Sequence, residues 1–128
     1  MEVTNEIETK VATLNYEGDI LILRWKKDAD VDLDSCIEII EIRKSIEREK
    51  KILLLIDQRQ FWNISKEAKD YSKREEVESL NKAIALLTGD WALSILIANS
   101  YIKLYKPNIP VKVFKSKDKA IKWLNSFK

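Results

Sequence analysis

The chain has 128 residues, a length that fits one domain spanning 1–128. Apolar residues make up 45% of it and charged residues 34%, as in an ordinary globular protein. Histidine is absent, which removes the usual general base of Ser–His and Cys–His systems and the commonest metal ligand. The single cysteine, Cys36, can form neither an intrachain disulfide nor a Cys-based zinc cluster. We therefore expect no enzyme, no cofactor and no metal site.

The polar, acidic stretch from Met1 to Glu6 lacks the basic start and apolar core of a signal peptide. The longest nearly apolar stretch, 91–98, is far shorter than the ~18 residues of a membrane helix. These features predict a cytoplasmic protein that is not transmembrane.

Charge is unevenly distributed. Residues 91–128 hold 8 basic residues against 1 acidic residue, whereas residues 1–90 hold 15 against 20. A Lys-rich C-terminal third can make weak contacts with anionic lipid or can simply keep the domain soluble. All eight basic residues are lysines, which argues against nucleic acid as a partner, because bidentate contacts to phosphate and guanine favour Arg.

The first half of the chain predicts a hairpin, a helix and a buried strand. Residues 8–16 alternate as a half-buried strand does, and a turn at Gly18 leads into a second strand over 20–25. Acidic residues before 36–46 and basic residues at its end favour a helix there. The helix has two apolar faces. One holds Leu33, Cys36, Ile37 and Ile40, and the nearly opposite one holds Ile39, Ile42 and Ile46. We expect one of these faces to contact the sheet and the other a neighbouring helix or a second subunit.

The apolar run 52–56, which ends at Asp57, is typical of a central strand covered on both faces. A short helix is predicted from Ser65 to Tyr71. Ser72 and Glu75 fit a capping box that opens an amphipathic helix, whose apolar face is Val77, Leu80, Ile84 and Leu87.

The last third predicts a second buried strand over 91–97 and a short helix over 99–106. Residues 111–114 suit an edge strand. Ser116 would cap a final helix with a buried stripe of Ala120, Trp123, Leu124 and Phe127. The order β-β-α-β-α-α-β-α-β-α predicts an α/β fold: a single mixed, mostly parallel five-stranded sheet with an N-terminal β-hairpin and covering helices.

Three segments resemble the SpoIIAA-like group of STAS-type domains: 54–59 (Leu-Leu-Ile-Asp-Gln-Arg), 64–71, and 110–114 together with 119–124. Small bacterial proteins of this group, related by fold to CRAL-TRIO lipid-binding domains, are similar over nearly the whole chain. The resemblance implies a regulatory or binding module. In anti-sigma-factor antagonists a phosphorylatable serine begins the helix after the central strand. Ser65 occupies the comparable place, although 62–66 lacks that motif's acidic neighbour and its glycine.

Four residues are candidate regulatory or ligand-site positions. Ser65 would be either a phosphorylated or anion-binding residue or a plain helix N-cap. Asp57 and Arg59 would either orient a polar ligand at the end of a parallel strand or anchor their own loop. Trp62, with Phe61, would either be exposed to a partner or roof the sheet. Cys36 is expected to be a buried small hydrophobe.

The main hypothesis is a non-enzymatic cytosolic regulatory or protein-interaction module that binds a protein partner or forms a homodimer. The alternative is a small apolar-ligand or lipid-binding protein with a pocket between sheet and helices. A carrier needs an internal cavity of several hundred Å³, whereas an interaction module needs a solid core and an exposed apolar patch.

Overall fold

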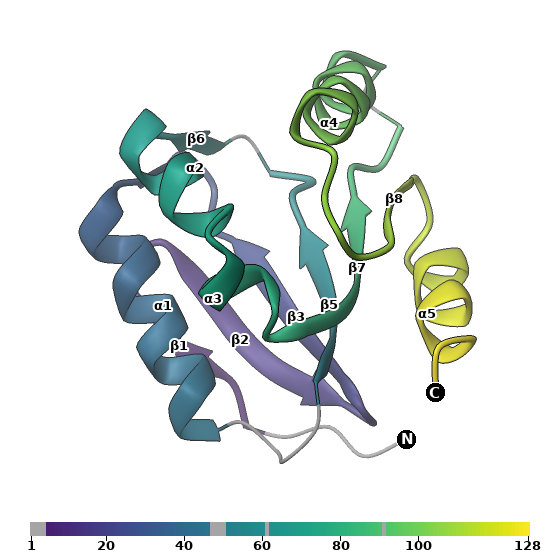
Figure 1. Cartoon of the computed structure of the whole chain (residues 1–128), viewed down its shortest axis with the longest axis horizontal. Coiled ribbons are helices and arrows are strands. Elements are labelled where there is room, and N and C mark those ends of the chain that lie inside the picture. Colours follow the sequence, from purple (N-terminus) through teal and green to yellow (C-terminus); the bar gives the residue numbers. More distant parts are fainter. Residues whose placement is uncertain (1–4, 47–50, 61, 91) are drawn as a thin grey trace.

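A computed structural model describes residues 5–46, 51–60, 62–90 and 92–128. The main sheet has six strands in the order β1-β2-β3-β5-β7-β8 (Figure 1). These are β1 (Ile7–Glu8), β2 (Ala12–Glu17), β3 (Ile20–Trp25), β5 (Ile52–Asp57), β7 (Asn81–Leu87) and β8 (Val111–Phe114).

The two pairings at the β1 side are antiparallel, and those of β3 with β5, β5 with β7 and β7 with β8 are parallel. The predicted hairpin is confirmed as β2 and β3, and β8 lies at the sheet edge as expected. Two parts of the prediction are wrong. The sheet has six strands rather than five, because β1 extends it beyond the hairpin, and with two antiparallel pairings it is only partly parallel.

A second, two-stranded sheet pairs β4 (Ala29–Val31) with β6 (Trp62–Ile64) in parallel. Neither strand was predicted from the sequence, since each is only three residues long. A positive φ of 60° at Asp28 turns the chain into β4.

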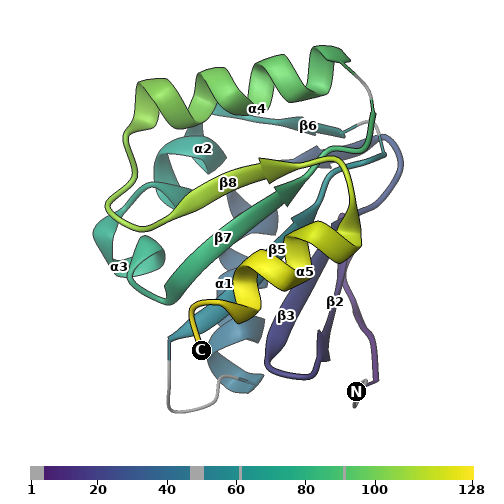
Figure 2. The same ribbon diagram turned by 90° about the vertical axis from the view of Figure 1, so that its right-hand side faces the viewer.

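Helices cover both faces of the main sheet. On one face lie α1 (Leu33–Ile46), α2 (Lys66–Ser72) and α3 (Glu75–Glu78), and α5 (Lys117–Asn125) lies on the other (Figure 1). Helix α4 (Ala92–Tyr105) lies at the top of both views, against β8 and at the periphery of the molecule (Figure 2).

The core is divided by the sheet into two clusters. Alternate residues of β5 enter each one: Leu54 is 2% exposed on the α1 side, and Leu55 is fully buried on the α5 side. This confirms β5 as a strand covered on both faces. On β7 the small side chains of Ala83 and Ala85, also fully buried, face the cluster that contains Ala120 and Leu124 of α5.

Helix α1 is confirmed, but the prediction of its two faces is wrong. The residues it buries are Cys36, Ile39, Ile40 and Arg43. This stripe, at spacings of three and four residues, takes members from both predicted faces. Arg43 is tolerated inside because its guanidinium donates a hydrogen bond to the side chain of Asn81, where β7 begins.

Residues 77–97 hold the largest errors. The amphipathic helix predicted over 77–87 is wrong: α3 ends at Glu78, and 81–87 is the strand β7. The strand predicted over 91–97 is also wrong, because α4 begins at Ala92. Short apolar runs fit a strand and a buried helix equally well, so periodicity alone does not separate the two.

The predicted capping box is likewise wrong. Ser72 is the last residue of α2, where its hydroxyl donates to the carbonyl oxygen of Lys69 at 2.7 Å, and the N-cap of α3 is Arg74. The final helix is confirmed: the Ser116 hydroxyl accepts from the Lys119 amide. Ala120 and Leu124 are fully buried, while Trp123 and Phe127 are partly buried.

Candidate functional site

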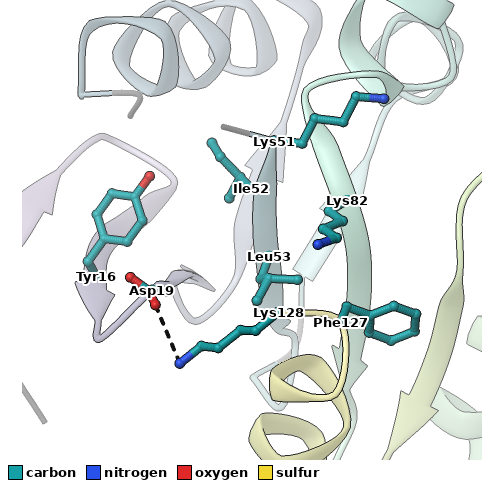
Figure 3. Close-up of a pocket in the computed structure, with 8 residues that line it drawn as sticks. All are labelled: Tyr16, Asp19, Lys51, Ile52, Leu53, Lys82, Phe127 and Lys128. Atoms are coloured by element: carbon teal, nitrogen blue, oxygen red, sulfur yellow. Dashed lines mark ion pairs between the residues drawn. The ribbon is translucent and has the colours of Figure 1, made fainter. Parts of the chain in front are cut away.

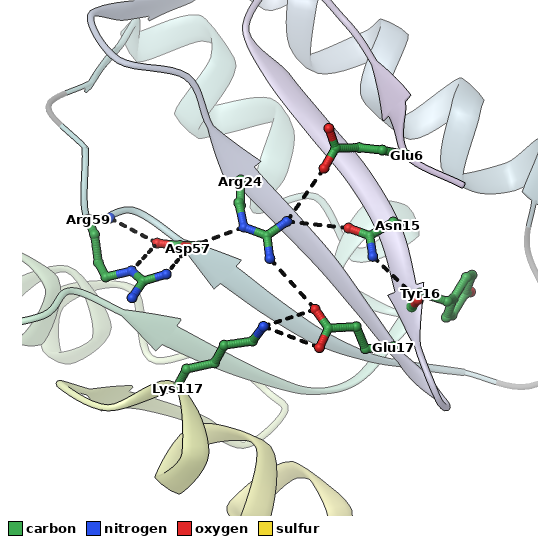
Figure 4. A network of polar contacts seen from close by, with 8 residues as sticks. All are labelled: Glu6, Asn15, Tyr16, Glu17, Arg24, Asp57, Arg59 and Lys117. Carbon is green, nitrogen blue, oxygen red and sulfur yellow. Dashed lines mark hydrogen bonds and ion pairs between the residues drawn. The ribbon is translucent and has the colours of Figure 1, made fainter. Parts of the chain in front are cut away.

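Asp57 and Arg59 form a tight ion pair at the carboxyl end of β5 (Figure 4). Arg59 Nε donates to Asp57 Oδ1 at 2.9 Å, and Arg59 Nη2 donates to Oδ2 at 2.7 Å. The Arg59 amide also donates to Oδ1 at 3.2 Å, so one carboxylate holds both the side chain and the backbone of the loop. This hydrogen bonding raises the pKa of Arg59 above its usual value.

The pair continues into a chain of charges along the sheet. Arg24 Nε lies 3.5 Å from Asp57 Oδ2, and Arg24 Nη2 lies 3.6 Å from Glu17 Oε2. Lys117, which begins α5, donates to both Glu17 oxygens at 3.0 and 3.2 Å. Positive and negative groups therefore alternate from α5 to the loop after β5. Arg24 Nη1 also lies 3.8 Å from Glu6 Oε2, so three cations are balanced by three carboxylates and the cluster has no free charge (Figure 4).

An open depression of about 380 Å³ lies beside this pair and is lined in part by Trp25 and Gln60. Gly89 lies next to Arg59: its φ of +69° favours glycine, and a Cβ there would be in van der Waals contact with the Arg59 side chain at 3.4 Å. Both oxygens of Asp57 are occupied by Arg59, so the carboxylate is poorly placed to act as a general base.

Ser65 is the N-cap of α2. Its hydroxyl accepts from the Ala68 amide at 3.1 Å, and its own amide donates to the Val31 carbonyl oxygen at 2.9 Å. The predicted capping position is therefore confirmed. Its hydrogen bonds go to α2 and β4, so the structure does not bring Ser65 into the Asp57–Arg59 cluster.

The aromatic prediction is only partly covered by the structure. Phe61 lies outside the described residues, and for Trp62 only the backbone is described, paired with Ala29 at the start of β6. Tyr71, which follows in α2, packs partly buried against the core on the α1 side.

Cys36 is a buried small hydrophobe, as expected. It is 7% exposed, and burial, helped by the charge of Asp32, raises the pKa of its thiol. A raised pKa keeps the thiol protonated and unreactive near neutrality.

A second open depression, of about 540 Å³, lies at the opposite end of the parallel strands (Figure 3). Its floor is formed by Ile52 and Leu53, and Lys51, Lys82 and Lys128 line it. Lys128 Nζ is paired with Asp19 Oδ2 at 3.4 Å. The three ammonium groups diverge rather than point at a common position (Figure 3).

Helix α4 carries a feature that the sequence analysis missed. Four of its six large aliphatic side chains face solvent: Leu93 is 51% exposed, Leu96 63%, Ile97 60% and Leu104 84%. The residues it buries against the protein are the small Ser94 and Ala98. We call these four aliphatic residues the α4 row.

At its C-terminal end α4 is held to the segment between α2 and β7. The Tyr105 hydroxyl donates to the buried carboxylate of Glu78 and lies 3.2 Å from the Lys73 carbonyl oxygen. The ammonium of Lys73 lies 5.3 Å from the Tyr101 ring and 5.5 Å from the Tyr105 ring. These contacts fix α4 with its row directed outward.

In the described ranges, no cluster of three or more His, Cys, Asp or Glu side chains could hold a metal ion. No helix among those residues is long and apolar enough to cross a membrane.

A family model described as "Domain of unknown function (DUF7793)" matches residues 14–128. The chain belongs to the DUF7793 family. The DUF7793 match runs from within β2 to the last residue, so the matched region includes Asp57, Arg59, α2 and α4. A search of the curated proteins finds no match.

Among solved structures, this DUF7793 chain is similar to an uncharacterized protein of the DUF3478 family from Shewanella loihica PV-4, which has a SpoIIAA-like fold. The TM-score is 0.63 at 15% sequence identity, and the match covers 95% of this chain and 93% of that one. The predicted SpoIIAA-like resemblance is thus confirmed at the level of the fold.

Proposed function

We propose that this protein is a non-enzymatic cytosolic module that regulates or recruits by binding, with helix α4 as its docking element. The α4 row carries the proposal. Four large aliphatic side chains more than half exposed on one helix are unusual for a surface that meets only water, and such patches mark interaction sites.

The rest of the structure supports binding at the surface rather than inside. The two clusters of the core fill the space between the sheet and its helices with buried residues that are at most 7% exposed. Both depressions described above are open to solvent, at opposite ends of the sheet. A carrier needs an enclosed apolar cavity, so the pocket hypothesis is the weaker one.

Ser65, Asp57, Arg59 and Trp62 remain secondary candidates within this proposal. Phosphorylation at Ser65 would place negative charge at the start of α2, close to the β4–β6 ribbon. The Asp57–Arg59 pair would offer a ligand mainly the outward half of the Arg59 side chain, which is 47% exposed.

Site-specific photocrosslinking in cells tests the docking role. A diazirine-bearing amino acid placed at Leu96 or Leu104 should give covalent adducts with another macromolecule, analysed for both protein and lipid. The matched controls carry the same group at Lys119 or Lys122, which are exposed on α5. Equal adduct yields from both helices, or none from α4, would contradict the proposal.

A further inference from the structure

Helix α4 exposes an apolar face along its length, and this face can lie against a flat surface. Successive residues of a helix are rotated by about 100°, which places the four residues of the α4 row in one sector of the helix surface. This sector is about 100° wide, like the apolar stripe of an ordinary buried helix. The row extends from Leu93, in the first turn, to Leu104, in the last. The helix lies along the outside of the molecule rather than pointing into it (Figures 1 and 2).

Resting on the docking role proposed above, we propose that the surface which α4 contacts is an anionic lipid bilayer. The helix would lie in the plane of the interface, with the α4 row inserted among the upper acyl chains and lysines at the headgroups. This is the binding mode of interfacial amphipathic helices, which combine apolar burial with attraction to anionic lipid.

The charge around α4 favours an anionic surface. The helix itself contains no acidic residue, Lys103 lies in its last turn, and Lys106 follows directly. Lys103 is on the edge of the exposed face, beside Leu96 at the i, i+7 spacing. Glu78, which bonds to Tyr105 of α4, is buried and also bonded to Asn108, so it adds little repulsion at the surface. The exposed Asp90 precedes α4 by two residues, at the end of the helix opposite to Lys103 and Lys106.

The size of the row argues against a second copy of this chain as the occupant. A 14-residue helix is about 21 Å long and about 10 Å wide. The footprint of the helix is therefore roughly 200 Å², and even with the relief of its side chains added, this one helix offers less accessible area than the roughly 800 Å² per partner of a stable interface. A bilayer has no such threshold, because side chains insert individually.

Vesicle flotation tests the inference with the purified chain. We expect it to float with vesicles of phosphatidylcholine mixed with phosphatidylglycerol, and much less with phosphatidylcholine alone. Raising the salt concentration should weaken binding, since surface attraction is screened.

Three double variants, one of them a control, separate apolar insertion from charge. Leu96→Ser with Leu104→Ser should lower the partition coefficient at least tenfold, because several methylene groups leave the acyl region. Lys103→Glu with Lys106→Glu should lower it at least tenfold as well, as about fivefold is expected for each lysine merely removed. Lys119→Glu with Lys122→Glu, a matched change of charge on α5, should lower it much less.

A label on α4 reports insertion directly. Ser100 lies among the α4 row, so Ser100→Cys carrying the environment-sensitive dye NBD should shift its emission to the blue on anionic vesicles. Lys119→Cys on α5 is the control and should show no shift. Cys36 is buried and should stay unlabelled in both.

Absence of flotation on both kinds of vesicle would overturn the inference, and so would an equal loss of binding from the α4 and α5 lysine pairs. If vesicles fail to bind while a crosslinker at Leu96 captures a protein in cells, the occupant is a protein and only the bilayer inference fails. If neither gives a signal, the docking role of α4 fails as well.

Discussion

The hydroxyl of Tyr105 on α4 donates a hydrogen bond to the carboxylate of Glu78 on α3. Glu78 is 7% exposed, and its other oxygen accepts from the Asn108 amide at 3.1 Å. A single buried acid therefore holds both the end of α4 and the turn that leads into β8. The orientation of the exposed α4 row depends on this contact.

Tyr105→Phe should destabilise the protein by about 1–3 kcal/mol, because it leaves one side of a buried carboxylate without its donor. Urea denaturation followed by circular dichroism measures the change. A loss below about 0.5 kcal/mol, the range of ordinary surface substitutions, would show that α4 is held by other contacts.

Because of Tyr105, we also expect the free energy of unfolding to fall at alkaline pH. Burial, with the hydrogen bond and charge of Glu78, raises the pKa of Tyr105 above its usual value. The folded state then keeps a proton that the unfolded state loses, so this contribution is complete below about pH 10 and decreases as the pH rises further. Unfolding free energies between pH 9 and 11 should fall more steeply for the wild type than for Tyr105→Phe. Parallel curves would contradict this assignment.

Arg59→Ala should cost about 1.5–3 kcal/mol, since the nearly buried Asp57 loses two charged hydrogen bonds. Lys44, paired with Glu41 at 3.9 Å on α1 where both side chains are mostly exposed, provides the control. Lys44→Ala should change stability by less than about 0.5 kcal/mol, as exposed ion pairs generally do. Equal effects in thermal unfolding would mean that the Asp57–Arg59 pair does not anchor its loop.

Ser65→Ala should destabilise by about 0.5–2 kcal/mol, because the Ala68 amide loses its cap. Ser65→Asp should be nearly neutral, since aspartate also caps and suits the helix dipole. Chemical denaturation of the three proteins tests the cap. If Ser65 also regulates docking, crosslinking from Leu96 should change with Ser65→Asp but not with Ser65→Ala; identical adducts from all three would leave Ser65 as a cap alone.

Leu54→Ala should cost about 2–5 kcal/mol, with contributions from lost transfer energy and from the cavity left in the α1-side core. Leu104→Ala on α4 is the matched substitution at an exposed site, and its effect on stability should be small. A loss below about 1 kcal/mol at Leu54 would mean that the core relaxes around the gap far more than usual.

The sequence predicted those elements whose local signals agree with their tertiary environment. The hairpin has alternation and a Gly18 turn, β5 has an apolar run ended by Asp57, and α5 has both a cap and an amphipathic stripe. Residues 81–97 failed for a physical reason. The alanines of β7 favour a helix intrinsically, but small side chains there let α5 pack against the sheet.

The candidate site was predicted in part. The adjacency of Asp57 and Arg59 in sequence was enough to expect a pair, whereas the role of Arg24 and Glu17 depends on strand pairing that brings distant residues together. The C-terminal part of α4 was predicted as the helix over 99–106, but its first part was interpreted as a buried strand, and this expectation of burial hid the exposure of its aliphatic residues. The signal for an exposed helix was available in the sequence: 92–105 contains no acidic residue and includes Lys103.

The position of α4 against β8 has a consequence for self-association. β8 is an edge strand, and an edge left open offers unpaired backbone groups to a strand from another molecule. With α4 beside it, the edge has a neighbour that hinders such pairing; a variant that releases α4 would expose β8 and invite growth of the sheet between molecules. The shortness of β8 and the exposed Lys112 in it then act as the remaining protection against polymerisation.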